Sequence, residues 1–379
     1  MNDLTLTNAR LVLPEEVTSG TVHVAGGSIA AVDTSPAASG EDMEGDYVIP
    51  GLVELHTDHL EGHYAPRPGV RWNPIAAAQA HDAQVAASGI TTVFDALRLG
   101  TSTDSGDFSD EDTRRLADAL DESITSGRLR ADHLLHVRCE VSAAECYESF
   151  QWFADHHRLR LASLMDHAPG QRQFASLDAY AAYYQGKLKM SDEDFARFCT
   201  ARLEASAANS DRNREAISAA CRERGVVVAS HDDATLAHVE ESIEQGARVA
   251  EFPTTSAAAQ AAHEAGLAVL MGAPNLIRGG SHSGNVSAGE LVEKRHLDIL
   301  SSDYIPFSLI QAAFHLGAME NDVLLPEAVS YVSRNPARAV GLDDRGEIAV
   351  GQRGDLVRVR VDGEVPIVRA VWREGHRVV

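Results

Sequence analysis

The feature that most constrains the fold is a unit that recurs through the middle of the chain: an apolar strand, a polar loop, a helix and a glycine. The helix predicted over 73–88, for example, has Asn73 as its cap, Pro74 at its first position and Gly89 after its end. Strands that alternate with helices predict parallel βαβ units. The eight strands expected on this basis are 52–58, 90–97, 133–140, 160–167, 226–232, 248–253, 267–273 and 297–303.

Eight such units favour a closed (β/α)8 barrel of the TIM type over an open sheet. A doubly wound dinucleotide-binding fold is the alternative, but no GxGxxG motif follows the first strand. A barrel needs about 250 residues, which leaves part of the 379-residue chain for a smaller domain. The predicted fold class is therefore α/β, with a barrel as the main body.

Both ends of the chain carry a different pattern. Residues 4–49 alternate apolar and polar positions between glycines, and similar strands return only near the C-terminus, over 354–361, 366–372 and 376–379. Neither piece is long enough to form a robust sheet alone. We therefore expect a small β-sandwich domain built from 1–50 and 345–379, with the barrel domain spanning 51–344.

Polar side chains stand at the ends of nearly all the expected barrel strands. In such barrels the reactive groups lie at the C-terminal ends of the strands. Carboxylates that converge there repel one another and destabilise the fold unless a cation lies among them. The sequence thus predicts a metal site, and the residues concerned are His56, Asp58, Asp95, Glu140, Asp166, His167, His231, Asp232, Asp233, Glu251 and Asp303.

His56 and Asp58 carry the strongest signal of metal binding. They lie two residues apart at the end of the apolar run after Pro50-Gly51, and the period of two puts both side chains on one face of a strand. His231 and Asp303 rank next, followed by His167. A carboxylate on the last strand could both bind a metal and accept the proton of a metal-bound water.

Glu140 is expected to replace a bridging lysine. Barrel hydrolases of this type often join two metals through a carboxylated lysine, but the lysines of this chain, Lys187, Lys189 and Lys294, end none of the expected strands. A salt bridge from Glu140 to Arg138 is the structural alternative, because alternation puts both on one face. Some strand-end acids are equally candidates for orienting a ligand histidine; the roles left open are those of His59, Asp95, Asp232 and Glu251.

Three loops on the catalytic face carry arginines beside glycines, at 65–72, 168–173 and 275–285. Glycines expose backbone N–H groups and arginines supply forked donors, a combination suited to phosphate. We therefore expect a phosphorylated ligand. The side chains expected to contact it are Arg67, Arg172, Arg278, His282 and Asn285.

The charge balance limits the classes of partner. A formal net charge of -23 disfavours a general nucleic-acid binder or a protein of anionic membrane surfaces, since both need basic patches. No run approaches the roughly 18 apolar residues that span a bilayer, and no signal peptide is recognisable. The four cysteines lack CxxC spacing and are expected to be reduced thiols. We expect a cytoplasmic enzyme that acts on a small phosphorylated substrate, with a homodimer as the candidate assembly.

With these residues assembled, the chain resembles the amidohydrolase superfamily, and within it the enzymes of phosphonate metabolism. The resemblance extends over nearly the whole barrel, although His59 stands where such enzymes have Asn after the His-x-Asp pair. The matching motifs are Pro50-Gly-Leu-Val-Glu-Leu-His-Thr-Asp58, Pro66-Arg-Pro-Gly69, His81-Asp-Ala83, Gly89-Ile-Thr-Thr-Val93, Asp166-His-Ala-Pro-Gly-Gln-Arg-Gln173, Ser230-His-Asp-Asp233 and Gly279-Gly-Ser-His-Ser-Gly-Asn285.

The resemblance implies a metal-dependent diphosphatase that cleaves α-D-ribose 1-methylphosphonate 5-triphosphate to the 5-phosphate and pyrophosphate. It implies one or two divalent ions, zinc before manganese or iron, whose bound hydroxide attacks the α-phosphorus while Asp303 takes the proton. Such a site suits this chemistry because it clamps phosphoryl oxygens and offsets charge on the leaving group. The implied metal ligands are His56, Asp58, Glu140, His167, His231 and Asp303.

Two alternatives remain open. A hydrolase of C–N bonds, such as an N-acyl amino acid deacylase or a cyclic amidase, would use the same hydroxide on a carbonyl, but the Arg/Gly-rich loops exceed what a neutral amide needs. A non-catalytic barrel retained as a scaffold would not need a set of buried, mutually repelling acids.

Overall fold

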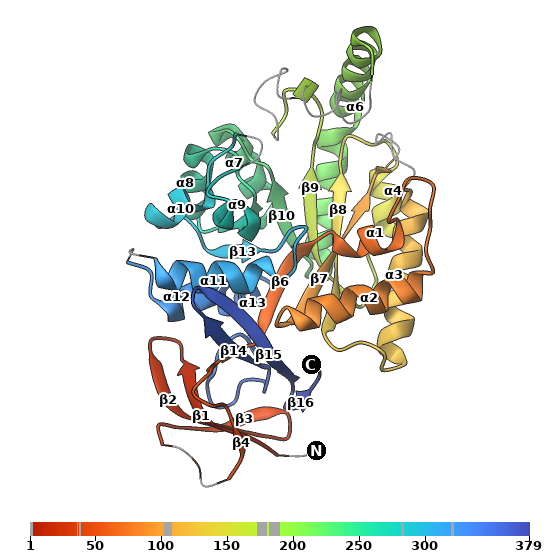
Figure 1. The fold of residues 1–379 in the computed structure, drawn as a ribbon. Helices are drawn as coiled ribbons and strands as arrows, with labels where there is room; N and C mark the ends of the chain where they lie inside the picture. Colours follow the sequence, from red (N-terminus) through yellow and green to blue (C-terminus); the bar gives the residue numbers. More distant parts are fainter. Residues whose placement is uncertain are drawn as a thin grey trace.

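A β/α barrel forms the main body of the protein (Figure 1). The computed structural model describes residues 3–35, 37, 39–101, 108–172, 180–181, 190–281, 284–319 and 322–379. Eight strands follow one another round the barrel in chain order, each parallel to its neighbours, and all overlap the predicted strands. Their bounds are β6 (Leu52–Thr57), β7 (Ile90–Leu99), β8 (Asp132–Glu140), β9 (Leu159–Met165), β10 (Val227–His231), β11 (Ala247–Glu251), β12 (Ala268–Gly272) and β13 (Ile299–Ser301).

The first and last barrel strands meet at a seam. Thr57 and Asp303 form a parallel backbone bridge, and the Ser302 N–H donates a hydrogen bond to Glu54 Oε2 at 2.6 Å. The seam brings the end of β6, which carries His56, next to Asp303, which lies two residues beyond the end of β13. Two predicted site residues from opposite ends of the barrel sequence therefore become neighbours.

The barrel interior is filled by apolar side chains from alternate strand positions, as the pleat requires. Burying this surface stabilises the fold by about 25 cal/mol per Å². Because the layer is closed, polar strand-end groups are gathered above it, at the C-terminal ends. The layer comprises Val53, Leu55, Phe94, Leu161, Val227, Ala229, Val249, Leu270 and Ile299, completed by Ala337 and Val340.

Helices follow the barrel strands, as expected. The Asn73 side chain caps α2 by accepting a hydrogen bond from the Ala76 N–H at 3.0 Å. The long α6 projects beyond the barrel (Figure 1) and ends at Gly225, whose φ of 68° suits glycine. The bounds are α1 (His59–Tyr64), α2 (Pro74–Ala87), α3 (Asp110–Thr125), α4 (Cys146–Gln151), α6 (Asp192–Arg224), α7 (Leu236–Glu244), α8 (Ser256–Glu264), α9 (Ala273–Ile277), α10 (Ala288–Glu293), α11 (Ser308–Ala318), α12 (Leu325–Ser330) and α13 (Arg334–Ala339).

The two ends of the chain build a second sheet together, as predicted (Figure 1). Pro50 of β5 faces Leu356 of β14 in an antiparallel pair. The sheet is continuous and surrounds one apolar core that includes Leu11 and Trp372. The division of the chain at 51 and 345 stays a prediction. The strands are β1 (Leu4–Val12), β2 (Val17–Ala25), β3 (Ser28–Asp33), β4 (Glu41–Asp42), β5 (Tyr47–Pro50), β14 (Leu356–Asp362), β15 (Val365–Arg373) and β16 (His376–Arg377).

Two simpler expectations concern cysteines and membranes. All four cysteines are free thiols, as predicted. Over the described ranges, no helix has the length and apolar character needed to cross a bilayer.

Candidate active site

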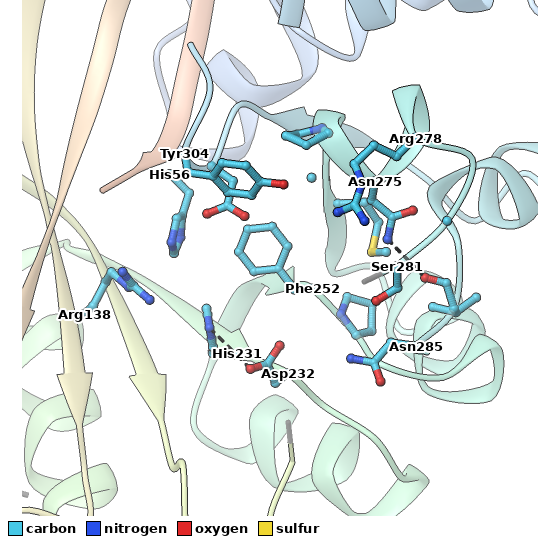
Figure 2. A pocket seen from close by; sticks show the side chains of 17 residues that line it. His56, Arg138, His231, Asp232, Phe252, Asn275, Arg278, Ser281, Asn285 and Tyr304 are labelled. Atoms are coloured by element: carbon cyan, nitrogen blue, oxygen red, sulfur yellow. Dashed lines mark hydrogen bonds and ion pairs between the residues drawn. The ribbon is translucent and has the colours of Figure 1, made fainter. Parts of the chain in front are cut away.

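A pocket opens at the C-terminal ends of the barrel strands (Figure 2). Three predicted ligands, His56, His231 and Asp303, reach it from β6, from β10 and from the residues after β13. The remaining lining residues are Arg138, Asp232, Phe252, Pro253, Met271, Gly272, Pro274, Asn275, Arg278, Gly280, Ser281, Asn285, Val286 and Tyr304.

A fully buried carboxylate, Glu251 at the end of β11, orients two of the predicted ligands. The Nδ1 atoms of His56 and His231 lie 3.1 Å and 3.2 Å from its oxygens, and Ser163 Oγ donates to it at 2.6 Å. Burial alone would raise the pKa of Glu251, but the histidines lower it well below its usual range. Burial also lowers the pKa of His56 to about 4, so the ring is neutral. With Nδ1–H donating to Glu251, its Nε2 keeps a lone pair for a metal.

A second carboxylate, Glu140, orients His167. Its Oε2 accepts a hydrogen bond from His167 Nδ1 at 2.6 Å. Burial alone would raise the pKa of Glu140, but His167 lowers it to about 2. Burial alone would lower the pKa of His167, but the negative charge of Glu140 outweighs burial and raises this pKa. Glu140 thus pairs with His167, and the salt bridge to Arg138 that alternation allowed does not form within the described structure.

The far side of His167 carries the clearest sign of a cation site. Its Nε2 lies 3.9 Å from Asp232 Oδ2, and the Nε2 of His231 lies 3.5 Å from the same oxygen. This carboxylate oxygen is buried and has no hydrogen-bond partner among the residues that the structure describes. A buried oxygen left in this way is costly. Two imidazoles and a carboxylate suit Zn²⁺ or a similar ion, so these residues fit the predicted metal.

Asp303 lies among acids that repel one another. Burial is the main cause that raises the pKa of Asp303 to about 7, and the negative charge of the nearby Asp58 adds to it. Burial also raises the pKa of Glu54, in the seam below, to about 7. Arg138 offers a nearby positive charge, with its Nη1 3.7 Å from Asp58 Oδ2. A bound cation would stabilise the charged carboxylates, so this side of the pocket fits a metal as well.

The predicted phosphate contacts are unevenly distributed. Arg278 and Asn285 line the pocket, on the loops beyond α9 (Figure 2). Arg67 lies in an exposed turn, outside the set of lining residues, where it pairs through its backbone with Val70. Its contact with substrate stays a prediction. His282 falls outside the described residues.

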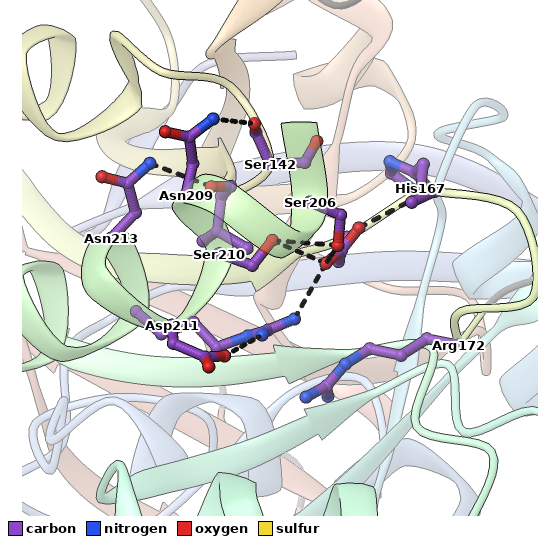
Figure 3. Close-up of polar contacts among 12 residues, drawn as sticks. Ser142, His167, Arg172, Ser206, Asn209, Ser210, Asp211 and Asn213 are labelled. Carbon is purple, nitrogen blue, oxygen red and sulfur yellow. Dashed lines mark hydrogen bonds and ion pairs between the residues drawn. The ribbon is translucent and has the colours of Figure 1, made fainter. Parts of the chain in front are cut away.

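Arg172 belongs to a separate polar network between β9, α6 and α7 (Figure 3). Its buried guanidinium pairs with Asp233 and Glu241. Asp166, at the end of β9, accepts hydrogen bonds from Ser206 and Ser210 of α6, each at 2.8 Å. Serine hydroxyls and an arginine of the protein therefore already engage the strand-end acids Asp166 and Asp233. Arg172 is not among the residues that line the pocket. Its contact with substrate stays a prediction.

Several lining residues were not predicted as site residues from the sequence, among them Arg138, Phe252 and Tyr304. Arg138 and Tyr304 line the pocket, and Phe252 packs edge-on against His56 and His231, with ring centroids 5.0 Å and 5.4 Å apart. The available signals were positional. Arg138 shares a strand face with the following acid, and the two aromatic residues each directly follow a strand-end acid.

Comparison with known proteins gives a match that spans nearly the whole chain. The chain is 47% identical over 377 residues to the α-D-ribose 1-methylphosphonate 5-triphosphate diphosphatase of Escherichia coli, covering 98% of this chain and 99% of that protein. It also matches the amidohydrolase family over residues 154–379. A segment of 61 residues is 41% identical to the adenine deaminase of Desulfatibacillum aliphaticivorans, covering 16% of this chain and 10% of that one.

Solved structures share the fold at low identity. N-Acetylglucosamine-6-phosphate deacetylase from Pasteurella multocida has a TM-score of 0.64 at 14% identity, covering 99% of each chain. Dihydropyrimidinase from Brevibacillus agri has a TM-score of 0.63 at 14% identity, covering 100% of this chain and 95% of that one. At these identities the likeness shows the barrel with its accessory sheet and nothing of the substrate.

Proposed function

This chain belongs to the amidohydrolase family and is a hydrolytic enzyme, and from that premise we propose that it hydrolyses α-D-ribose 1-methylphosphonate 5-triphosphate to the 5-phosphate and pyrophosphate. The observation that carries the proposal is the 47% identity, over 98% of this chain, to an enzyme named for that activity. The pocket adds support, because Arg278 and Asn285 offer donors for phosphate beside the metal-type side chains.

The proposal includes one or two Zn²⁺ ions, with Mn²⁺ or Fe²⁺ as alternatives. Imidazole nitrogen and carboxylate oxygen are suitable ligands for zinc. When bound, such an ion lowers the pKa of water and stabilises charge on phosphoryl oxygens. Glu140, predicted as a bridging ligand, also accepts a hydrogen bond from His167, an arrangement that suits it to orienting that histidine, as Glu251 orients two others. The ligands proposed are His56, Asp58, Glu140, His167, His231 and Asp303, with Asp232 added because its carboxylate lies between the Nε2 atoms of His167 and His231.

Asp303 is the proposed acceptor of the proton released from the attacking water. Its carboxylate lines the pocket together with His56 and His231, where a general base could reach a water held by the metal. Arg278 and Asn285 would hold the polyphosphate from the opposite side of the pocket. Arg138 would offset negative charge near Asp58.

Several further expectations remain part of this proposal. They are a cytoplasmic location, a homodimeric assembly, no binding of nucleic acid and a division into domains of 1–50 with 345–379 and 51–344. The formal net charge of -23 supports the lack of nucleic-acid binding, since phosphate backbones repel an acidic surface.

Phosphorus NMR of the reaction products tests the proposed function. The zinc-reconstituted enzyme should release pyrophosphate from the ribose triphosphate, and the Asp303→Asn variant should not. Removal of the metal with a chelator should abolish turnover, and zinc should restore it. A fully metallated enzyme without turnover would refute the proposed substrate and direct the search to acylated amines and cyclic amides.

A further inference from the structure

We infer a second metal site, formed by His59 and His63 of α1 and His81 of α2, that binds one Zn²⁺ or another late transition-metal ion. None of these histidines is among the residues lining the pocket. The site lies where the α1–α2 pair packs outside the barrel, and it does not depend on the proposed reaction.

Helix α1 presents two of the three imidazoles. His59 and His63 are four residues apart on this helix, a spacing that puts both side chains on one face. Their ring centroids lie 4.8 Å apart, and each lies 6.1 Å from the centroid of His81. With zinc–nitrogen bonds of about 2.1 Å, imidazoles sharing one ion have centroids roughly 5 Å apart. The His59–His63 spacing already matches this value, and binding of an ion would require side-chain rotations that shorten both distances to His81.

Asp95 prepares His81 to act as a ligand. Asp95 Oδ1 accepts a hydrogen bond from His81 Nε2 at 2.8 Å, so the lone pair remains on Nδ1. His81 is fully buried, and its Nδ1 has no hydrogen-bond partner within the described ranges. A carboxylate on the far nitrogen is the usual companion of a metal-bound histidine. The sequence left the role of Asp95 open. In this arrangement Asp95 orients His81 of α2 and does not serve the pocket.

A neighbouring histidine is excluded as a ligand by its own contacts. His133 lies between two carboxylates, with Nδ1 2.8 Å from Asp95 Oδ2 and Nε2 3.3 Å from Asp82 Oδ1. Burial alone would lower the pKa of His133, but the two carboxylates raise it to about 9. The ring is thus a cation with both nitrogens engaged. It neutralises charge around Asp95 and leaves His81 as the available ligand.

His63 and Gln84 complete the set of donors. The Nε2 of His63 is buried and, in the part of the chain that the structure describes, has no hydrogen-bond partner. Gln84 Oε1 lies 2.8 Å from His59 Nε2 and offers a fourth donor atom. Burial lowers the pKa of both His63 and His81, so both rings are neutral at pH 7. Three imidazole ligands favour zinc, copper or nickel over Mg²⁺ and Ca²⁺, which prefer oxygen.

A purely structural cluster of histidines is the competing explanation. In that case water molecules satisfy the buried nitrogens, and the zinc content of the protein does not depend on His63.

Zinc content after equilibrium dialysis separates the two explanations. The full chain, its His63→Phe variant and a His376→Phe control would be dialysed against the same zinc buffer and analysed by mass spectrometry of the metal. His376 is exposed on β16, in the terminal sheet. We expect the wild type and the control to hold one zinc per chain more than His63→Phe. Equal contents in all three proteins would overturn the inference.

A second variant and a second measurement protect the test from misfolding. His63→Gln would replace the Phe variant if circular dichroism showed the latter to be unfolded. With Co²⁺ in place of zinc, the visible absorption of the wild type should exceed that of both His63 variants by the contribution of one further nitrogen-ligated ion; identical spectra would contradict the site. Because the comparison is a difference in metal content, an inactive wild type would refute the proposed reaction without changing this result.

Discussion

Replacing Asp303 with Asn would show by how much its buried negative charge lowers the free energy of unfolding when no cation is bound. Burial and Asp58 raise the pKa of Asp303 from 3.8 to about 7 in the folded protein. The folded chain then holds this proton more tightly than the unfolded chain does. The stabilisation from that proton is complete below about pH 4 and is lost as the pH rises to about 7. About three pKa units at 1.36 kcal/mol each correspond to about 4 kcal/mol.

The expected effect is about 2–4 kcal/mol, because part of the side chain contacts solvent and its neighbours titrate with it. Asn can adopt the φ of 55° found at this position, so the exchange removes charge with little change in shape. Urea unfolding in the presence of a chelator should therefore show Asp303→Asn to be more stable than the wild type at pH 8 and about equal to it near pH 4.

Zinc should reverse the difference at pH 8, because the wild type gains binding free energy that the variant lacks. Asp362→Asn, at an exposed position at the end of β14, serves as the control and should change stability little under any condition. The reasoning would be refuted by a metal-free Asp303→Asn variant that is less stable than the wild type at pH 8. An equal difference at both pH values would refute it too.

Three further substitutions test separate parts of the structure. Glu251→Gln should weaken zinc binding about 10–100-fold, measured by competition with a chelator, because it removes the charge that orients two histidines; unchanged affinity would contradict that role. Arg278→Ala should raise KM for the triphosphate by about 10–100-fold, the loss of one charge-assisted hydrogen bond, with little change in the unfolding midpoint. Gly51→Ala puts a Cβ 2.2 Å from Thr91 Oγ1 and should lower the free energy of unfolding by about 2 kcal/mol or more. The Gly289→Ala control meets only one atom, at 4.0 Å, and should leave the free energy of unfolding nearly unchanged.

The parts of the structure that depend on local patterns were predictable. Strand alternation and helix caps report short-range physics, so the strands and the cap at Asn73 could be identified without tertiary contacts. His56, His231 and Asp303 were predictable as pocket residues because the C-terminal ends of parallel barrel strands lie on one face. Their distance in sequence was therefore no obstacle.

The partners of long or buried polar side chains were not predictable in the same way. The ion pairs of Arg172 with Asp233 and Glu241, from the next β/α unit, could not be predicted from its loop sequence. An arginine reaches many acids, and tertiary packing decides which one it pairs with. Glu251 illustrates the same point, because its strand-end position allowed metal ligation or histidine orientation equally. Only the positions of the two imidazoles distinguish these roles.

The pairing of β5 with β14 has a consequence for how the protein is made. Pro50 faces Leu356, a partner synthesised about 300 residues later. At about 5–20 residues per second, the ribosome takes roughly 15–60 s to cover that interval. Throughout this time the nascent β1–β5 segment has an unpaired edge, which is prone to intermolecular association. Chaperone demand during translation should therefore centre on the N-terminal strands, and a premature stop before 356 would leave them without their native neighbour.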